Sequence, residues 1–152
     1  MKSWLIKNNT MFFNCSKCLY ICRVKENFGK EYKLCSKLLI DAVFAGGNRL
    51  KQYPLYAIVL ETKLTENVPF QVLISVPKKK VKRAVQRNFI KRLIREAFRK
   101  NKVHLESFIE NTKKKYAICF VYSSNELPTF EFIQEKVEKL IIKLIDHENT
   151  TS

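Results

Sequence analysis

Apolar and polar positions along this chain predict helices and strands in turn. The first clear segment, residues 37–45, has apolar side chains at helical spacing. Ser36 stands where an N-cap is expected, and Gly46 and Gly47 follow as a stop signal. The pattern therefore predicts a short helix over residues 37–45.

From Arg49 the pattern changes to that of strands. Residues 55–60 alternate between two faces, a polar turn follows at 62–67, and a second apolar stretch covers 70–76. Two or three strands are expected here, with 55–60 and 70–76 forming a hairpin.

The last part of the chain predicts one strand and one helix. Residues 116–122 form a short, continuously apolar run, which is typical of a central strand covered on both faces. Pro128 then begins a helix whose apolar residues recur at helical spacing, namely Phe132, Ile133, Val137, Leu140, Ile141 and Leu144.

Length and composition fit a single domain with one core, since 46% of the 152 residues are apolar and 12% are aromatic. We expect residues 1–28 to be an extension, 29–147 the domain and 148–152 a tail. Apolar stretches fall short of the roughly 18 residues that a membrane span needs. Lys17 and Arg23 interrupt the N-terminal segment, so we expect no signal peptide and a cytoplasmic location.

Positive charge is concentrated in residues 78–102. This segment holds 12 of the 29 Lys and Arg residues but one of the 14 Asp and Glu residues, so it carries +11 of the net charge of +15. At about 100° per residue of helix, one side is apolar and would dock on the core through Ile90, Leu93, Ile94, Ala97 and Phe98. Another side presents Asn88, Lys91, Arg92, Arg95 and Arg99.

A cationic helix face of this kind is typical of a protein that binds nucleic acid. Neutralised phosphates release counterions, and the planar guanidinium group matches phosphate geometry. The alternative is a solvated helix face, but such faces usually alternate the signs of their charges, whereas Glu96 is the only acidic residue here. A DNA-recognition helix is disfavoured because predicted strands flank this helix.

The same residues carry a resemblance to a known family. Residues 87–98, RNFIKRLIREAF, preceded by ISVPKK at 74–79, closely resemble the RNR signature of the protein subunit of bacterial ribonuclease P. The resemblance implies an α/β (α+β) two-layer sandwich, with a four-stranded sheet and three helices in the order αβββαβα. It also implies a left-handed crossover through the basic helix.

For function, the resemblance implies a subunit that binds the catalytic RNA and the 5′ leader of precursor tRNA and promotes hydrolytic removal of the leader. The catalytic centre and its Mg²⁺ ions would then belong to the RNA. A non-catalytic ribosomal or other structural RNA-binding protein is the alternative that composition alone leaves open.

By position, the resemblance assigns contacts with the catalytic RNA, or with the metal-rich region near the cleavage site, to Arg87, Asn88, Lys91, Arg92 and Arg95. The positive charge of the segment adds further RNA-binding candidates in the loop and the helix, namely Lys78, Lys79, Lys80, Lys82, Arg83 and Arg99. The resemblance assigns the leader to a cleft lined by Ile40, Phe44, Tyr56 and Ile58, where bases would stack. Core packing is an equal alternative for Ile40 and Ile58. Phe89 stands where the family usually has the second Arg of its signature, and we expect it to pack rather than stack on a base. Lys82 stands where the family loop usually has a Gly.

The sequence offers no convincing catalytic or metal site. His104 and His147 are predicted near helix ends, and Glu96 is expected to be a local counter-charge. Cys15 and Cys18 have the spacing of a zinc half-site, but no second ligand pair has a matching spacing. We therefore expect reduced thiols, no catalytic residue and no cofactor held by the protein alone.

Overall fold

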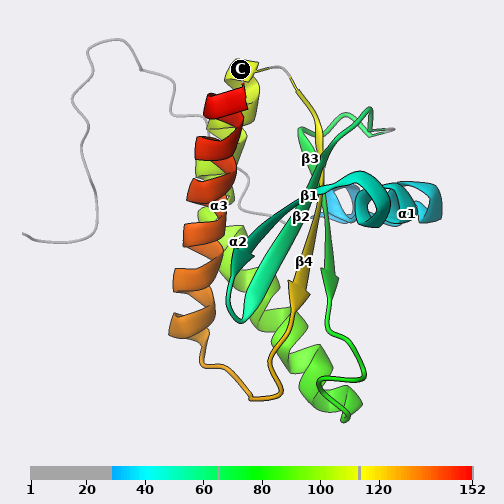
Figure 1. Ribbon diagram of the computed structural model, residues 1–152, viewed down its shortest axis with the longest axis vertical. Coiled ribbons are helices and arrows are strands. Elements are labelled where there is room, and N and C mark those ends of the chain that lie inside the picture. Colours follow the sequence, from blue (N-terminus) through cyan, green and yellow to red (C-terminus); the bar gives the residue numbers. More distant parts are fainter. Residues whose placement is uncertain (1–28, 65, 113, 152) are drawn as a thin grey trace, which may run out of the picture.

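The computed structural model describes residues 29–64, 66–112 and 114–151 (Figure 1). Its elements follow the predicted order of helices and strands. They are η1 (Lys30–Tyr32), α1 (Lys37–Gly46), β1 (Asn48–Gln52), β2 (Leu55–Glu61), β3 (Phe70–Ser75), α2 (Ala84–Thr112), β4 (Tyr116–Tyr122) and α3 (Phe130–Thr151). The predicted extension, residues 1–28 with Cys15 and Cys18, lies outside the described residues.

The four strands form one mixed sheet in the order β1-β2-β4-β3. β1 and β2 are antiparallel, β2 and β4 are antiparallel, and β3 and β4 are parallel. The predicted hairpin between 55–60 and 70–76 is therefore wrong: β4 lies between these strands, and β2 forms its hairpin with β1 instead. The fully apolar β4 takes the central place because there it is covered by a strand on each edge and by helices on both faces.

The prediction that residues 116–122 form a central strand is confirmed, since all seven side chains are buried. β3 and β4 are joined through α2, so this connection is a parallel crossover. Its left-handed sense stays a prediction.

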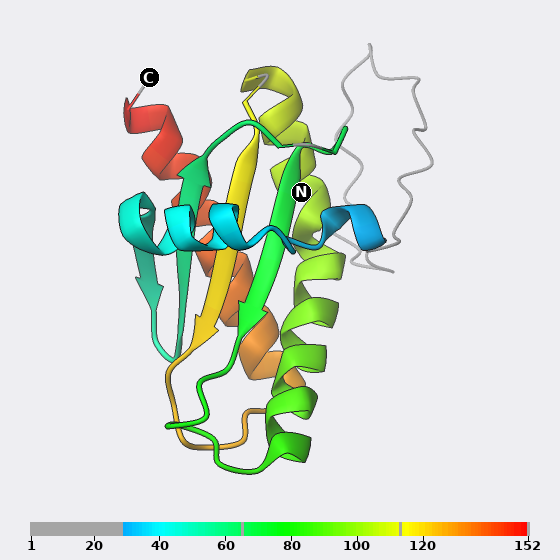
Figure 2. The ribbon, with the colours of Figure 1, turned by 90° about the vertical axis from the view of Figure 1, so that its right-hand side faces the viewer.

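Helices cover both faces of the sheet (Figures 1 and 2). α2 and α3 pack on one face, where Leu55, Ala57 and Val59 of β2 belong to the main core. α1 lies across the other face, where Ile58 packs against Val43 in a second, smaller cluster. α1 thus adds a partial third layer to the two-layer arrangement that was expected, while the α+β class and the alternation along β2 are confirmed.

The docking side of α2 is confirmed in detail. Ile90, Ile94, Ala97 and Phe98 are each fully buried, and Leu93 packs at the edge of the main core. The Phe98 ring meets Phe70 edge to face at 5.5 Å between centroids. Such burial fixes the rotation of α2 about its axis, so the charged side of the helix must face outward.

Candidate nucleic-acid interface

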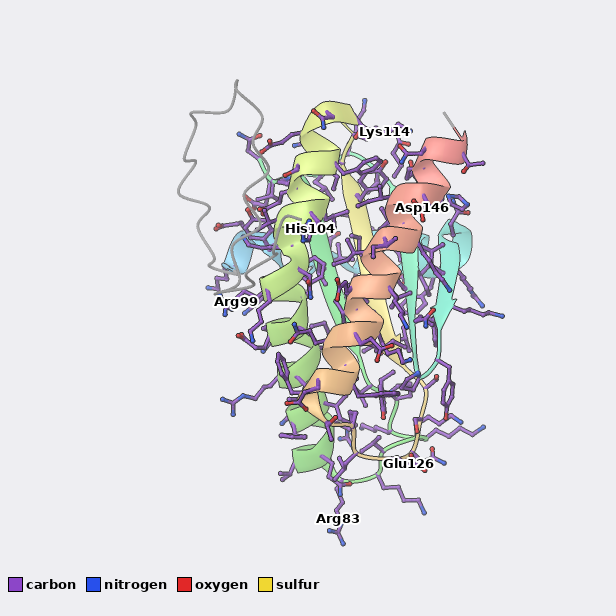
Figure 3. The ribbon with its side chains drawn as sticks, turned by 90° about the vertical axis from the view of Figure 1, so that its left-hand side faces the viewer. Arg83, Arg99, His104, Lys114, Glu126 and Asp146 are labelled. Carbon is purple, nitrogen blue, oxygen red and sulfur yellow. The ribbon has the colours of Figure 1, made fainter. Side chains whose placement is uncertain are left out.

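The loop between β3 and α2 is a compact turn with its apolar ends buried. Val76 and Val81 are buried, and the backbone N–H groups of Lys80 and Val81 both donate to the carbonyl of Pro77 at 3.0 and 3.2 Å. We call residues 77–83 the basic loop; Lys82, which stands where the family loop usually has a Gly, follows this turn directly. The cations of the basic loop are all exposed, namely Lys78, Lys79, Lys80, Lys82 and Arg83, and Figure 3 shows Arg83 projecting at the start of α2.

Arg87 holds this loop against the helix. Its Nη1 donates to the carbonyl oxygens of Val81 at 3.1 Å and Lys82 at 2.7 Å. Hydrogen bonds from a charged donor are the stronger kind, so Arg87 positions the lysines of the loop. Its predicted contact with RNA stays a prediction, since part of its guanidinium is already engaged within the protein.

Beyond Arg87, four residues form what we call the basic stripe of α2: Asn88, Lys91, Arg92 and Arg95. Asn88, Arg92 and Arg95 are exposed and Lys91 is half-buried. Within the described part of the chain, none of the three cations has an ion-pair partner. The stripe is thus a surface of uncompensated positive charge on a rigid helix.

Two cations of the same segment are instead paired within the protein. Arg99 donates to both carboxylate oxygens of Glu96, at 2.9 and 2.7 Å, and this hydrogen bonding lowers the pKa of Glu96. Lys102 is buried, with its Nζ 3.2 Å from Glu106 and 4.9 Å from the ring centre of Tyr32. The cationic surface is therefore smaller than the charge of the segment suggests.

The predicted leader-binding residues lie on the α1 side of the sheet. Phe44 is 41% exposed, while Ile40 and Tyr56 are half-buried beside the smaller core cluster. Ile58 is only 1% exposed, because α1 covers it, so its assignment to an open cleft is wrong and the packing alternative holds. The leader contact of the other three stays a prediction.

Sequence reasoning missed three residues beside Tyr56. Arg49, Lys51 and Tyr53 line a depression of about 340 Å³ together with Tyr56, Leu55 and Ser123. The pairing of Lys51 with Tyr56 in the β1–β2 hairpin brings them there. The available signal was the basic and aromatic side chains at alternate positions 49, 51 and 53. It was not used because residues 55–60 were expected to pair with 70–76 instead of with β1.

Strand register places this depression and the basic loop at the same end of the sheet. Leu55 at the start of β2 pairs with Tyr122, and Ser75 at the end of β3 pairs with Val121. The Tyr53 turn, the loop that follows β3 and the start of α2 therefore lie at the same end of the sheet, the lower end in Figure 1, with β4 between β2 and β3. The fold gathers cations and aromatic rings from three distant parts of the sequence.

Phe89 is 48% exposed and lines a groove with Phe130. The expected burial of Phe89 against the sheet or loop is therefore wrong. Its side chain leaves α2 about 100° away from that of the docking residue Ile90, which turns it toward the start of α3 and the solvent.

The described residues contain no group of three or more His, Cys, Asp or Glu side chains placed to hold a metal ion. His104 and His147 are both exposed. Burial raises the pKa of the Cys119 thiol to about 12, so this thiol is neutral at physiological pH. Among the described helices, none combines the length and apolar character that crossing a membrane requires.

A family model of ribonuclease P matches residues 28–145 of this sequence. This chain belongs to the ribonuclease P protein family. It is 36% identical over 116 residues to the ribonuclease P protein component of Porphyromonas gingivalis strain W83, covering 76% of this chain and 84% of that relative. It is 29% identical over 122 residues to the protein component of Chlorobium phaeobacteroides, covering 74% and 84% respectively.

Solved structures of ribonuclease P proteins have the same fold. The Staphylococcus aureus protein superposes with a TM-score of 0.59 at 24% identity, over 74% of this chain and 94% of that one. The Thermotoga maritima protein superposes with a TM-score of 0.59 at 22% identity, over 73% and 96%. The family match and the curated relatives, rather than these structures, make the chain a ribonuclease P protein that serves tRNA processing, and the ribosomal-protein alternative is not favoured.

Proposed function

We propose that this ribonuclease P protein binds the catalytic RNA through its basic loop and basic stripe. The observation that carries the proposal is the set of cations on α2, exposed Arg92 and Arg95 and half-buried Lys91, that have no ion-pair partner among the described residues. The fully buried docking side of the same helix holds them outward. Uncompensated charge on a rigid support loses little conformational entropy on binding. A structured polyanion is the ligand that rewards such an arrangement.

The proposal assigns no chemical step to the protein. Cleavage of the precursor tRNA is hydrolysis of a phosphodiester, which needs an activated water and stabilisation of the leaving oxygen. Mg²⁺ ions bound with the RNA subunit would supply both. The exposed cations of this chain would lower phosphate repulsion between the RNA and its substrate, so that the two associate at lower Mg²⁺ concentration.

The second part of the proposal concerns precursor tRNA. Its single-stranded 5′ leader would lie along the α1 side, near Phe44 and Tyr56, with Arg49 and Lys51 beside the phosphates. Aromatic rings accept any base by stacking, so a leader of any sequence would be accommodated. A protein that acts with RNA in tRNA maturation would work in the cytoplasm.

Purification of the tagged chain from its own cells, followed by sequencing of the bound RNA, tests this proposal. We expect one abundant structured RNA, together with precursor tRNAs that retain their leaders. A Lys91→Ala, Arg92→Ala, Arg95→Ala variant serves as the control and should recover much less of both. Recovery of ribosomal RNA alone would contradict the proposal.

A further inference from the structure

A groove runs between the first turns of α2 and the start of α3. Its volume is about 700 Å³, within the roughly 300 to 1,000 Å³ of sites that hold small organic ligands. Its lining comes from neighbouring turns of α2 and the first residue of α3: Val85, Asn88, Phe89, Arg92, Leu93, Arg95, Glu96 and Phe130. We call it the aromatic groove.

The apolar side chains of the groove range from half-buried to mostly exposed. Leu93 and Phe130 are half-buried and pack on the main core, whereas Phe89 is 48% and Val85 81% exposed. The Lys100 ammonium lies 4.7 Å from the centre of the Phe130 ring. An exposed aromatic ring next to an already ordered apolar floor provides a flat surface that a planar ligand would cover.

The charged part of the groove selects an anion. Arg92 and Arg95 are exposed and have no ion-pair partner among the described residues. Glu96 is the only acidic group in the lining, and Arg99 neutralises it through two hydrogen bonds. Two free guanidinium groups beside a flat apolar surface match a nucleotide, which has a planar base and a phosphate, better than an apolar protein segment, which would leave both cations unpaired.

We propose that the aromatic groove binds one unpaired nucleotide of the RNA partner, with its base stacked on Phe89 and its phosphates held by Arg92 and Arg95. The exposed amide of Asn88, which both donates and accepts hydrogen bonds, faces the edge of that base. This inference rests on the proposed RNA binding and adds to it a site that binds a base as well as phosphates. It makes the two arginines part of a nucleotide site as well as part of the stripe.

The test compares two single-stranded RNA oligonucleotides of equal length, one of adenosines and one with abasic riboses. Both carry the same phosphates, so their difference in affinity reports stacking. Phe89→Leu should weaken binding of the adenosine oligonucleotide by about 5- to 150-fold, which corresponds to the roughly 1 to 3 kcal/mol of one stacked base. Binding of the abasic oligonucleotide should change less than twofold.

Phe132→Leu is the matched control. Phe132, like Phe89, is an exposed phenyl ring, but it lies outside the groove. The Lys136 ammonium lies 4.9 Å from the centre of its ring. Replacement of Phe132 should leave both affinities unchanged. Phe89→Trp keeps an aromatic face and should bind the adenosine oligonucleotide at least as tightly as the natural chain.

The inference would be overturned if Phe89→Leu weakened binding of both oligonucleotides equally, or if it weakened binding of neither. An equal effect of Phe132→Leu would also overturn it. Thermal unfolding of each variant separates loss of binding from loss of fold. If Phe89→Leu has no selective effect while the natural chain still recovers RNA from cells, the groove assignment fails alone. If the natural chain binds no RNA in either experiment, the proposed function fails as well.

Discussion

Removal of the three cations of the basic stripe should reduce the salt dependence of RNA binding. Lys91→Ala, Arg92→Ala, Arg95→Ala removes charges that have no partner within the described residues. Each phosphate that the variant no longer neutralises should lower the slope of log affinity against log salt by about 0.7 to 0.9. Three such phosphates change the slope by about 2 to 3 units, and therefore cost roughly two to three decades of affinity at about 0.1 M salt relative to 1 M.

Stability should change little, because Arg92 and Arg95 are exposed, Lys91 is half-buried, and surface positions away from buried networks usually contribute within about 0.5 kcal/mol each. The assay is equilibrium binding of a bacterial ribonuclease P RNA at several salt concentrations, with unfolding by denaturant as the check of the fold.

The matched control removes three exposed lysines from other parts of the chain, Lys63, Lys139 and Lys143. Both triple variants have a net charge of +12, since 15 minus 3 is 12. We expect the control to retain nearly the full slope. An unchanged slope in the stripe variant would show that the stripe is a solvated helix face that does not contact RNA. An equal decrease in both variants would show that net charge, rather than local phosphate contacts, determines the salt dependence.

Three further predictions concern stability and chemistry. Gly47→Ala should destabilise the fold by about 1 to 3 kcal/mol, because its new methyl group would lie 2.5 Å from the Ile58 side chain of the sheet. Gly46→Ala meets nothing within 4 Å and should be nearly neutral in the same denaturant titration. Equal effects of the two substitutions would refute this. Burial raises the pKa of Cys119 to about 12, so its contribution to stability is complete below the unfolded thiol pKa near 9 and is lost as pH rises toward 12. Cys119→Ala should therefore reduce the alkaline slope of the unfolding free energy against pH by up to about 1.4 kcal/mol per pH unit. An unaltered slope would contradict this. His104→Ala and His147→Ala should leave the rate of cleavage by the reconstituted complex nearly unchanged. A large decrease in a folded variant would mean that the protein takes part in the chemical step.

Local pattern was enough to predict the elements and the docking side of α2. Ile90, Ile94 and Phe98 are spaced so that a helix buries them together, and this spacing is visible without any tertiary information. Strand pairing was not predictable in this way. Alternation along β2 identifies its two faces but not its neighbours, and the neighbour β4 lies more than fifty residues away in sequence.

Charge was the least reliable guide to the surface. Lys102 stands four residues after Phe98, on the buried side of α2, and its partner Glu106 follows at the next turn. That i,i+4 pair could have been recognised from the sequence. The role of Arg87 could not, since its acceptors are backbone carbonyls whose positions depend on the turn of the basic loop.

Reconstitution tests the central claim most directly, namely that this chain assists an RNA enzyme and does no chemistry itself. Cleavage of precursor tRNA is measured at low Mg²⁺ concentration with a bacterial ribonuclease P RNA alone, with the protein alone and with both. The account predicts cleavage at the mature 5′ end only when both are present, and a reduced rate with the stripe variant. Cleavage by the protein alone, or no stimulation of the RNA by a folded protein that binds it, would contradict the account.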